Sequence, residues 1–107
     1  MGEAAGRSSY FRLYTAFFQD PRYAPLRLES KVLYGIFLSR HSLSEQNGWR
    51  DPGGRTFFYC TIAEACRLLG CKRSKAMAVL RELEGQSLIS RIKQGRGKPD
   101  RIYLHKL

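Results

Sequence analysis

The sequence has no run of about 18 apolar residues, and its polar N-terminus has no apolar signal-peptide core. We therefore expect neither a membrane-spanning helix nor a secretory signal, and a cytoplasmic location. Cysteine and histidine are also scarce. Cys60, Cys66 and Cys71 lack the Cys-x-x-Cys spacing, and His41 and His105 lie far from them in the sequence. This spacing disfavours zinc, so we expect reduced, buried thiols and no metal.

A catalytic set is missing as well. No histidine stands beside a candidate nucleophile, and Gly95-Arg96-Gly97-Lys98 matches a phosphate-binding loop only in part. Such a loop needs Gly-x-x-x-x-Gly-Lys-Ser/Thr between a strand and a helix, because the helix N-terminus and the hydroxyl complete the site. Here Pro99 follows the lysine and no helix is expected. We therefore predict that the chain is not an enzyme and uses no cofactor.

Basic residues, by contrast, are abundant and unevenly placed. The 107 residues hold 19 Lys and Arg against nine Asp and Glu, a net charge of +10. Residues 71–107 hold ten of the basic and three of the acidic residues, so they carry +7 of this charge. A positive field of this kind attracts polyanions, most often nucleic acid. A charged surface that only aids solubility is the simpler alternative.

The expected order of elements follows from hydrophobic period and turn residues. Residues 1–9 are small and polar and are predicted to be a disordered lead, and residues 10–107 to form one domain. Apolar residues at helical spacing predict the longest helix from Leu28 to about Ser44. The Asn-Gly and Pro-Gly-Gly pairs predict a loop over 45–55, which Trp49 anchors to the body. The aromatic run 56–60 favours a short strand.

The next segment has the features of two helices joined by a tight turn. Thr61-Ile62-Ala63-Glu64 matches a capping box, in which threonine and glutamate side chains each accept a backbone N–H. Gly70 is suited to end that helix. A second helix should begin near Lys72 or Arg73, because the following apolar residues fall on one face: Ala76, Val79, Leu80 and Leu83.

Two β-like runs, 88–93 and 101–106, follow this pair and are joined by the Gly-rich basic stretch 94–100. Two such runs with a glycine turn predict a hairpin. The fold class expected is therefore α+β: a winged helix-turn-helix that is mostly helical, with a C-terminal hairpin wing and a short strand before the helix pair.

In a helix-turn-helix the second helix enters the major groove of DNA and its N-terminal residues meet the base edges. The wing would lie against the sugar-phosphate backbone or in the minor groove. A solvated amphipathic helix fits the same spacing, but the basic wing favours DNA. The candidate DNA-binding residues on the second helix and the wing are Lys72, Arg73, Ser74, Lys75, Ala78, Arg81, Lys93, Arg96, Lys98 and Arg101.

The segment before Asp20 is rich in aromatic residues and is expected to be a strand or a short helix. It holds more rings than one short helix needs, so two interpretations stay open: a dimer interface, or a filling for the core beneath the long helix. The residues concerned are Tyr10, Phe11, Tyr14, Phe17 and Phe18.

Over about residues 9–105 the sequence resembles the N-terminal domain of plasmid replication initiator protein A of Gram-positive bacteria. The resemblance is carried most specifically by Asn47-Gly48-Trp49, by Leu69-Gly70-Cys71 and by the run from Gly95 to Tyr103. It implies a winged-helix domain, typically dimeric, that binds repeated sequences at a replication origin, while a C-terminal domain elsewhere recruits host replication proteins. Lys72 departs from the capping residue that similar proteins place there, so Ser74 is the alternative cap.

The leading hypothesis is sequence-specific binding of double-stranded DNA at origin repeats, which initiates replication of a plasmid or an integrative element. A winged-helix transcriptional regulator is the alternative within DNA binding. A module used chiefly for dimerisation or protein interaction is the alternative outside it.

Overall fold

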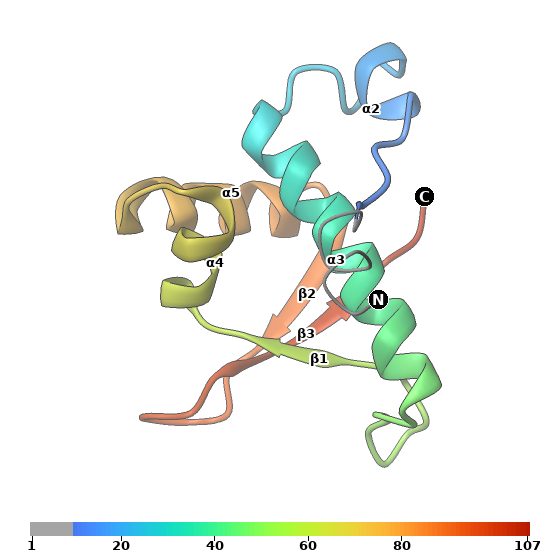
Figure 1. Ribbon diagram of the computed structural model, residues 1–107, viewed down its shortest axis with the longest axis vertical. Coiled ribbons are helices and arrows are strands. Elements are labelled where there is room, and N and C mark those ends of the chain that lie inside the picture. Colours follow the sequence, from blue (N-terminus) through green and yellow to red (C-terminus); the bar gives the residue numbers. More distant parts are fainter. Residues whose placement is uncertain (1–9) are drawn as a thin grey trace, which may run out of the picture.

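The computed structural model describes residues 10–107 (Figure 1). Residues 1–9, expected to be a disordered lead, lie outside this range. Three helices of two or more turns surround a small sheet, and a single helical turn precedes them. In chain order the elements are α2 (Ala16–Gln19), α3 (Leu28–Gln46), β1 (Phe58–Cys60), α4 (Ile62–Leu69), α5 (Arg73–Gly85), β2 (Ile89–Ile92) and β3 (Asp100–Leu104).

The long helix α3 confirms the prediction and runs two residues further, to Gln46. Among the apolar residues whose spacing predicted it, Leu33 and Phe37 are fully buried, whereas Leu43 is 57% exposed. Tyr34 is also fully buried. The buried face also holds polar groups that hydrophobic spacing cannot identify. Lys31 is one of them: its Nζ donates to the carbonyl of Ala24 at 3.0 Å, which satisfies the buried ammonium.

The start of α3 is capped by a residue from another helix. Its N-cap residue, Arg27, offers no side-chain acceptor. Instead Glu82 of α5 accepts from the backbone N–H of Arg27 at 3.0 Å and from the hydroxyl of Ser30, which is fully buried. A carboxylate at this position also opposes the positive end of the helix dipole. Glu82 therefore joins α5 to the N-terminal end of α3.

The hairpin forms as predicted, and β1 adds a third strand to it. The sheet is antiparallel with the order β1-β3-β2, so β3 is central. Ile102 faces Phe58 across one ladder and Arg91 across the other. Ile89, Phe58, Ile102 and Leu104 face the helices and enter the core, whereas the opposite face of the sheet carries Tyr59, Arg101 and Tyr103.

The helix pair α4–α5 forms where the sequence predicts it. The Thr61 hydroxyl accepts the backbone N–H of Glu64 at 3.0 Å, and Gly70 ends α4 in the left-handed conformation. One half of the predicted capping box is wrong, because the Glu64 carboxylate instead pairs with Arg40 of α3 at 2.6 Å. The alternative cap is wrong as well: Ser74 lies inside α5, and Lys72 is the N-cap, without a side-chain bond.

In the aromatic N-terminal segment, residues 10–14 form neither helix nor strand, and the short helix α2 follows them. Phe17 is fully buried, with an edge contact to Tyr34 at 5.2 Å between ring centroids, so this ring fills the core and is not part of a dimer interface. Tyr14 is half-buried against the same rings. Phe11 crosses Gly35 so closely that a Cβ there would lie 2.7 Å from its ring. Only glycine admits this segment onto α3.

The loop between α3 and β1 folds back onto the outer face of the sheet. Trp49 packs against Phe57 and Tyr59, with ring centroids 6.1 and 5.7 Å away, as predicted for an anchor. Cys60, at the end of β1, is buried, and burial raises the pKa of its thiol to about 12. It is therefore a protonated core residue. Cys60, Cys66 and Cys71 form no disulfide.

Replacing the interhelix cap tests this arrangement. Glu82→Ala leaves the N–H of Arg27 and the buried hydroxyl of Ser30 without their acceptor, so we expect a loss of about 1–3 kcal/mol in the free energy of unfolding. Glu45→Ala, which removes an exposed carboxylate from the other end of α3, should cost well under about 1 kcal/mol. Urea denaturation measures both, and equal small losses would show that Glu82 is not a cap.

Candidate nucleic-acid interface

The exposed face of α5 lies opposite its buried stripe. Ala76, Val79, Leu80 and Leu83 are buried, as predicted. Because a helix advances about 100° per residue, Ser74, Ala78 and Arg81 share the opposite face. Ser74 and Arg81 are exposed and Ala78 is half-buried, so this face is shallow in the middle and polar at its ends. Lys72 and Arg73 project from the N-terminal end of the helix, and both are exposed.

Lys75 sits at the edge of this surface. Its Nζ lies 3.3 Å from the Glu29 carboxylate in the first turn of α3. Hydrogen bonds from the backbone of Glu29 and from Lys75 hold the pKa of Glu29 below its usual value. Glu29 thus stays ionised and lowers the local positive potential beside α5. The sequence carries no signal of this contact, because the partners are 46 positions apart.

The wing is a turn in which the N–H of Lys98 donates to the carbonyl of Gly95 at 3.2 Å. Gly95 and Gly97 have φ of 124° and 76°, values that strain residues with a side chain, so the turn depends on glycine at both positions. Lys93, Arg96 and Lys98 are exposed on this loop. The wing tip is therefore a short basic loop without apolar cover.

Arg101 lies elsewhere. It is in β3 rather than at the wing tip, and its guanidinium stacks on the Phe57 ring at 4.6 Å. Its nitrogens also lie 3.3 Å from the Tyr103 hydroxyl and 3.4 Å from the Gln94 side-chain oxygen. A DNA contact by this residue stays a prediction, and the geometry assigns the guanidinium to contacts within the domain.

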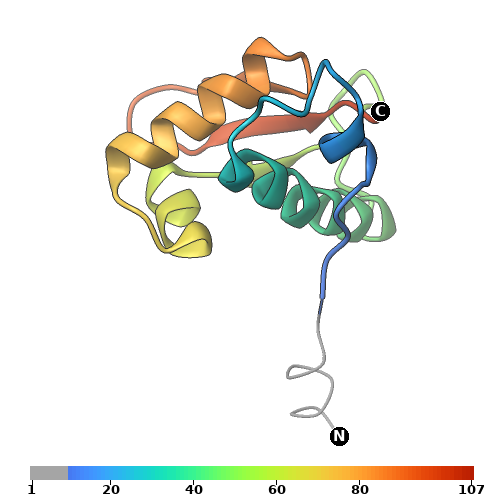
Figure 2. The same ribbon diagram turned by 90° about the horizontal axis from the view of Figure 1, so that it is seen from above.

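The other candidate residues come together on one side of the molecule. In Figures 1 and 2 the N-terminal end of α5 and the wing loop both lie toward the left of the view. The wing loop extends past the ends of β2 and β3. Lys75 pairs with Glu29, but six other cations of this surface take part in no ion pair within residues 10–107. They are Lys72, Arg73, Arg81, Lys93, Arg96 and Lys98.

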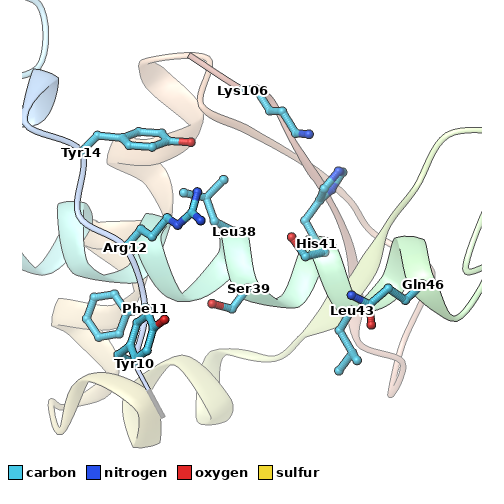
Figure 3. Close-up of a pocket in the computed structure, with 11 residues that line it drawn as sticks. Tyr10, Phe11, Arg12, Tyr14, Leu38, Ser39, His41, Leu43, Gln46 and Lys106 are labelled. Carbon is cyan, nitrogen blue, oxygen red and sulfur yellow. The ribbon is translucent and has the colours of Figure 1, made fainter. Parts of the chain in front are cut away.

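A groove lies on another part of the surface, away from α5 and the wing. It has a volume of about 600 Å³ and lies between the segment 10–14, α3 and Lys106 (Figure 3). Tyr10 and Phe11 line it from the N-terminal segment, and His41 and Leu43 line it from α3. Burial lowers the pKa of His41, so its imidazole is neutral near pH 7. Phe18, also predicted for a dimer interface, lies outside the groove beneath the Lys31 ammonium, 4.4 Å away.

Residues 10–107 lack two kinds of feature, a membrane-spanning helix and a cluster of metal ligands. No helix there is long and apolar enough to cross a membrane. No three His, Cys, Asp or Glu side chains there are grouped as metal ligands would be.

Comparison with known proteins places these features in a family context. Residues 9–107 match the family described as "Replication initiator protein A (RepA) N-terminus". A "41 kDa protein" of Lactobacillus helveticus is 28% identical over 91 residues, which cover 79% of this chain and 26% of that protein. The chain thus spans about a quarter of the length of this relative.

Solved structures resemble the whole chain. One described as "Structure of Rep-DNA complex" has a TM-score of 0.80 and 26% identity, and the match covers 99% of this chain and 82% of that chain. A second, "N-Terminal domain of DNA binding protein", has the same TM-score and identity and is covered over 81%. A third, "Structure of MDR initiator", has a TM-score of 0.78 and 29% identity, with 99% and 84% covered. The winged helix-turn-helix expected from the sequence is confirmed by this likeness and by the sheet.

Removing the carboxylate beside Lys75 tests the electrostatics of this surface. Glu29→Gln frees the ammonium and should raise affinity for duplex DNA at low salt by about two- to threefold. Glu45→Gln changes the net charge equally but at the far end of α3, and it should change affinity less. Fluorescence anisotropy measures both, and equal gains would contradict a local effect.

Proposed function

Because the chain belongs to the family of replication initiator protein A N-termini, we propose that it binds double-stranded DNA sequence-specifically, at repeated sites of a replication origin. The observation that carries this proposal is the group of six cations on α5 and the wing, which lie on one side of the domain without ion-pair partners among residues 10–107. The domain acts as a binding module in the cytoplasm and not as an enzyme.

The exposed face of α5 supplies the groups suited to base edges. An arginine can donate two parallel hydrogen bonds to guanine, and a serine both donates and accepts. Arg73, Ser74 and Arg81 carry these groups, and the small Ala78 allows the helix to approach the groove closely. Lys72 and the wing cations Lys93, Arg96 and Lys98 meet phosphates, which hold the helix in register without reading sequence.

The similarity to initiators extends this proposal to replication of a plasmid or an integrative element. The structures it resembles are described as a Rep-DNA complex, a DNA-binding protein and an initiator. The Lactobacillus helveticus relative is about four times longer than the matched region. A further region in such proteins would engage the host replication proteins, and the present domain would bring that region to the origin.

Two substitutions separate anchoring from reading. Lys98→Ala removes a phosphate contact, so affinity should fall alike for all duplexes and the slope of log K against log salt should decrease by about one. Arg73→Ala should lower affinity for the origin repeats and also relax base preference, by about 1–3 kcal/mol per lost pairing. Salt titrations on origin repeats and random duplex measure both. Equal affinity of the wild type for the two duplexes would contradict sequence specificity.

We also propose that the chain forms a homodimer through the groove between segment 10–14 and α3. Apolar groups there face solvent, since Tyr10 is 86% and Leu43 is 57% exposed. A second copy would cover them, together with Phe11 and the half-buried Tyr14, which line the same groove. Two domains held in this way would bind paired half-sites, as symmetric DNA-binding proteins do.

Light scattering tests the dimer. Leu43→Glu places a charge in the groove without touching the core, so the wild type should have twice the mass of this variant at the same concentration. Leu28→Glu, an equally exposed leucine of α3 outside the groove, is the matched control and should stay dimeric. A monomeric wild type would refute the dimer and leave the proposal of DNA binding intact.

A further inference from the structure

We propose that Arg91 and Arg101 are positioning residues that fix the angle of the wing relative to α5. They would act from the base of the hairpin, Arg91 on the inner face of the sheet and Arg101 on the outer face. This inference rests on the proposed function, because it concerns how the wing cations are aimed at the duplex that α5 reads.

Arg91 connects three elements on the inner face. It lies in β2, and its guanidinium is 2.8 Å from the carboxylate of Glu84 in the last turn of α5. The same guanidinium is 3.8 Å from the carboxylate of Asp100, the first residue of β3 after the wing. Only 18% of the Arg91 side chain is exposed. A recessed, doubly paired guanidinium is poorly placed to reach a phosphate and well placed to hold the strand against the helix.

Arg101 makes the corresponding link on the outer face. Its guanidinium, stacked on Phe57, donates to the side-chain oxygen of Gln94 on the first arm of the wing. The amide of Gln94 in turn donates to the carbonyl of Pro99 on the second arm, at 3.4 Å. Arg101 thus braces the two arms at the point where the strand ladder ends.

The same network extends away from the wing to the loop after α3. Arg101 donates to the Tyr103 hydroxyl, which donates to Asp51 at 2.6 Å. The hydrogen bond from Tyr103 is the largest influence that holds the pKa of Asp51 below its usual value, so this acceptor stays ionised. The wing base is therefore held by α5 on one face and by the loop 47–57 on the other.

A brace is needed because the wing loop has little else to hold it. The strand pairing between β2 and β3 ends at Ile92 and Arg101. Beyond it lie two glycines with positive φ and three exposed cations, Lys93, Arg96 and Lys98. If the base of the wing were free to tilt, only some conformers would place these cations near phosphates. The wing would then contribute less to the affinity for DNA.

The experiment compares each arginine in two backgrounds. Arg91→Met and Arg101→Met keep an unbranched apolar stem and remove the charged guanidinium group. They are measured in the wild-type chain and in a chain carrying Arg96→Ala and Lys98→Ala. Arg22→Met is the matched control, since Arg22 also stacks on a ring, Tyr23 at 5.1 Å, and carries the same charge, but has no contact with the network at the wing base. The readout is affinity for the origin duplex at fixed salt, with thermal unfolding measured for every variant.

If the arginines act through the wing, each substitution should weaken binding about three- to tenfold in the wild type and less than about twofold when the tip cations are absent. Arg22→Met should change affinity by less than about twofold in both backgrounds. An equal loss in both backgrounds would overturn the proposal, because a direct phosphate contact or partial unfolding does not depend on the wing tip. Glu84→Gln weakens the Arg91 pair from the other side, and should give the same pattern even where Arg91→Met lowers the folded fraction.

The proposed function fails in a different way. It is refuted if the wild-type chain binds the origin duplex no more tightly than random duplex. If instead the chain with Arg96→Ala and Lys98→Ala binds the origin duplex as tightly as the wild type, only the positioning role is refuted, because α5 then binds DNA without the wing tip.

Discussion

The pairing of β3 with β1 on one side and β2 on the other is the constraint on which the arrangement of the domain depends. β1 leads directly into the cap of α4, and β2 follows directly from α5, so the central strand joins both ends of the helix pair to the wing. Because side chains alternate along a strand, a slip of one residue would expose Ile102 and bury Arg101. Register therefore decides at once which groups fill the core and which support the wing.

Charge is divided between two tasks. Several acidic residues neutralise cations of the body: Glu64 pairs with Arg40, Glu82 with Arg27 and Glu84 with Arg91. These contacts join α3, α4, α5 and the sheet. Apart from Lys75, which pairs with Glu29, the cations on the exposed face of α5 and on the wing have no such partners within residues 10–107. These unpaired cations repel one another, and a bound polyanion would reduce this repulsion.

Sequence patterns predicted the parts of the fold that local signals determine. The Thr61 cap, the Gly70 terminus, the apolar face of α5 and the glycine turn of the wing each depend on residues within a few positions of one another. Contacts between distant residues were not predictable: the pairing of β1 with β3, the cap of α3 by Glu82 and the Glu29–Lys75 pair join segments that share no local pattern. Arg101 illustrates the limit for the site, since composition marks it as basic but only the fold shows what its guanidinium contacts.

The central claim is that the start of α5 and the wing loop bind one duplex together. Backbone amide chemical shifts of the domain, followed while duplex DNA is added, test it most directly. The account predicts that the large shifts fall in residues 72–81 and 93–98 and saturate at the same DNA concentration. Shifts confined to one of these segments, or centred on the groove beside Tyr10 or on the loop around Trp49, would contradict it.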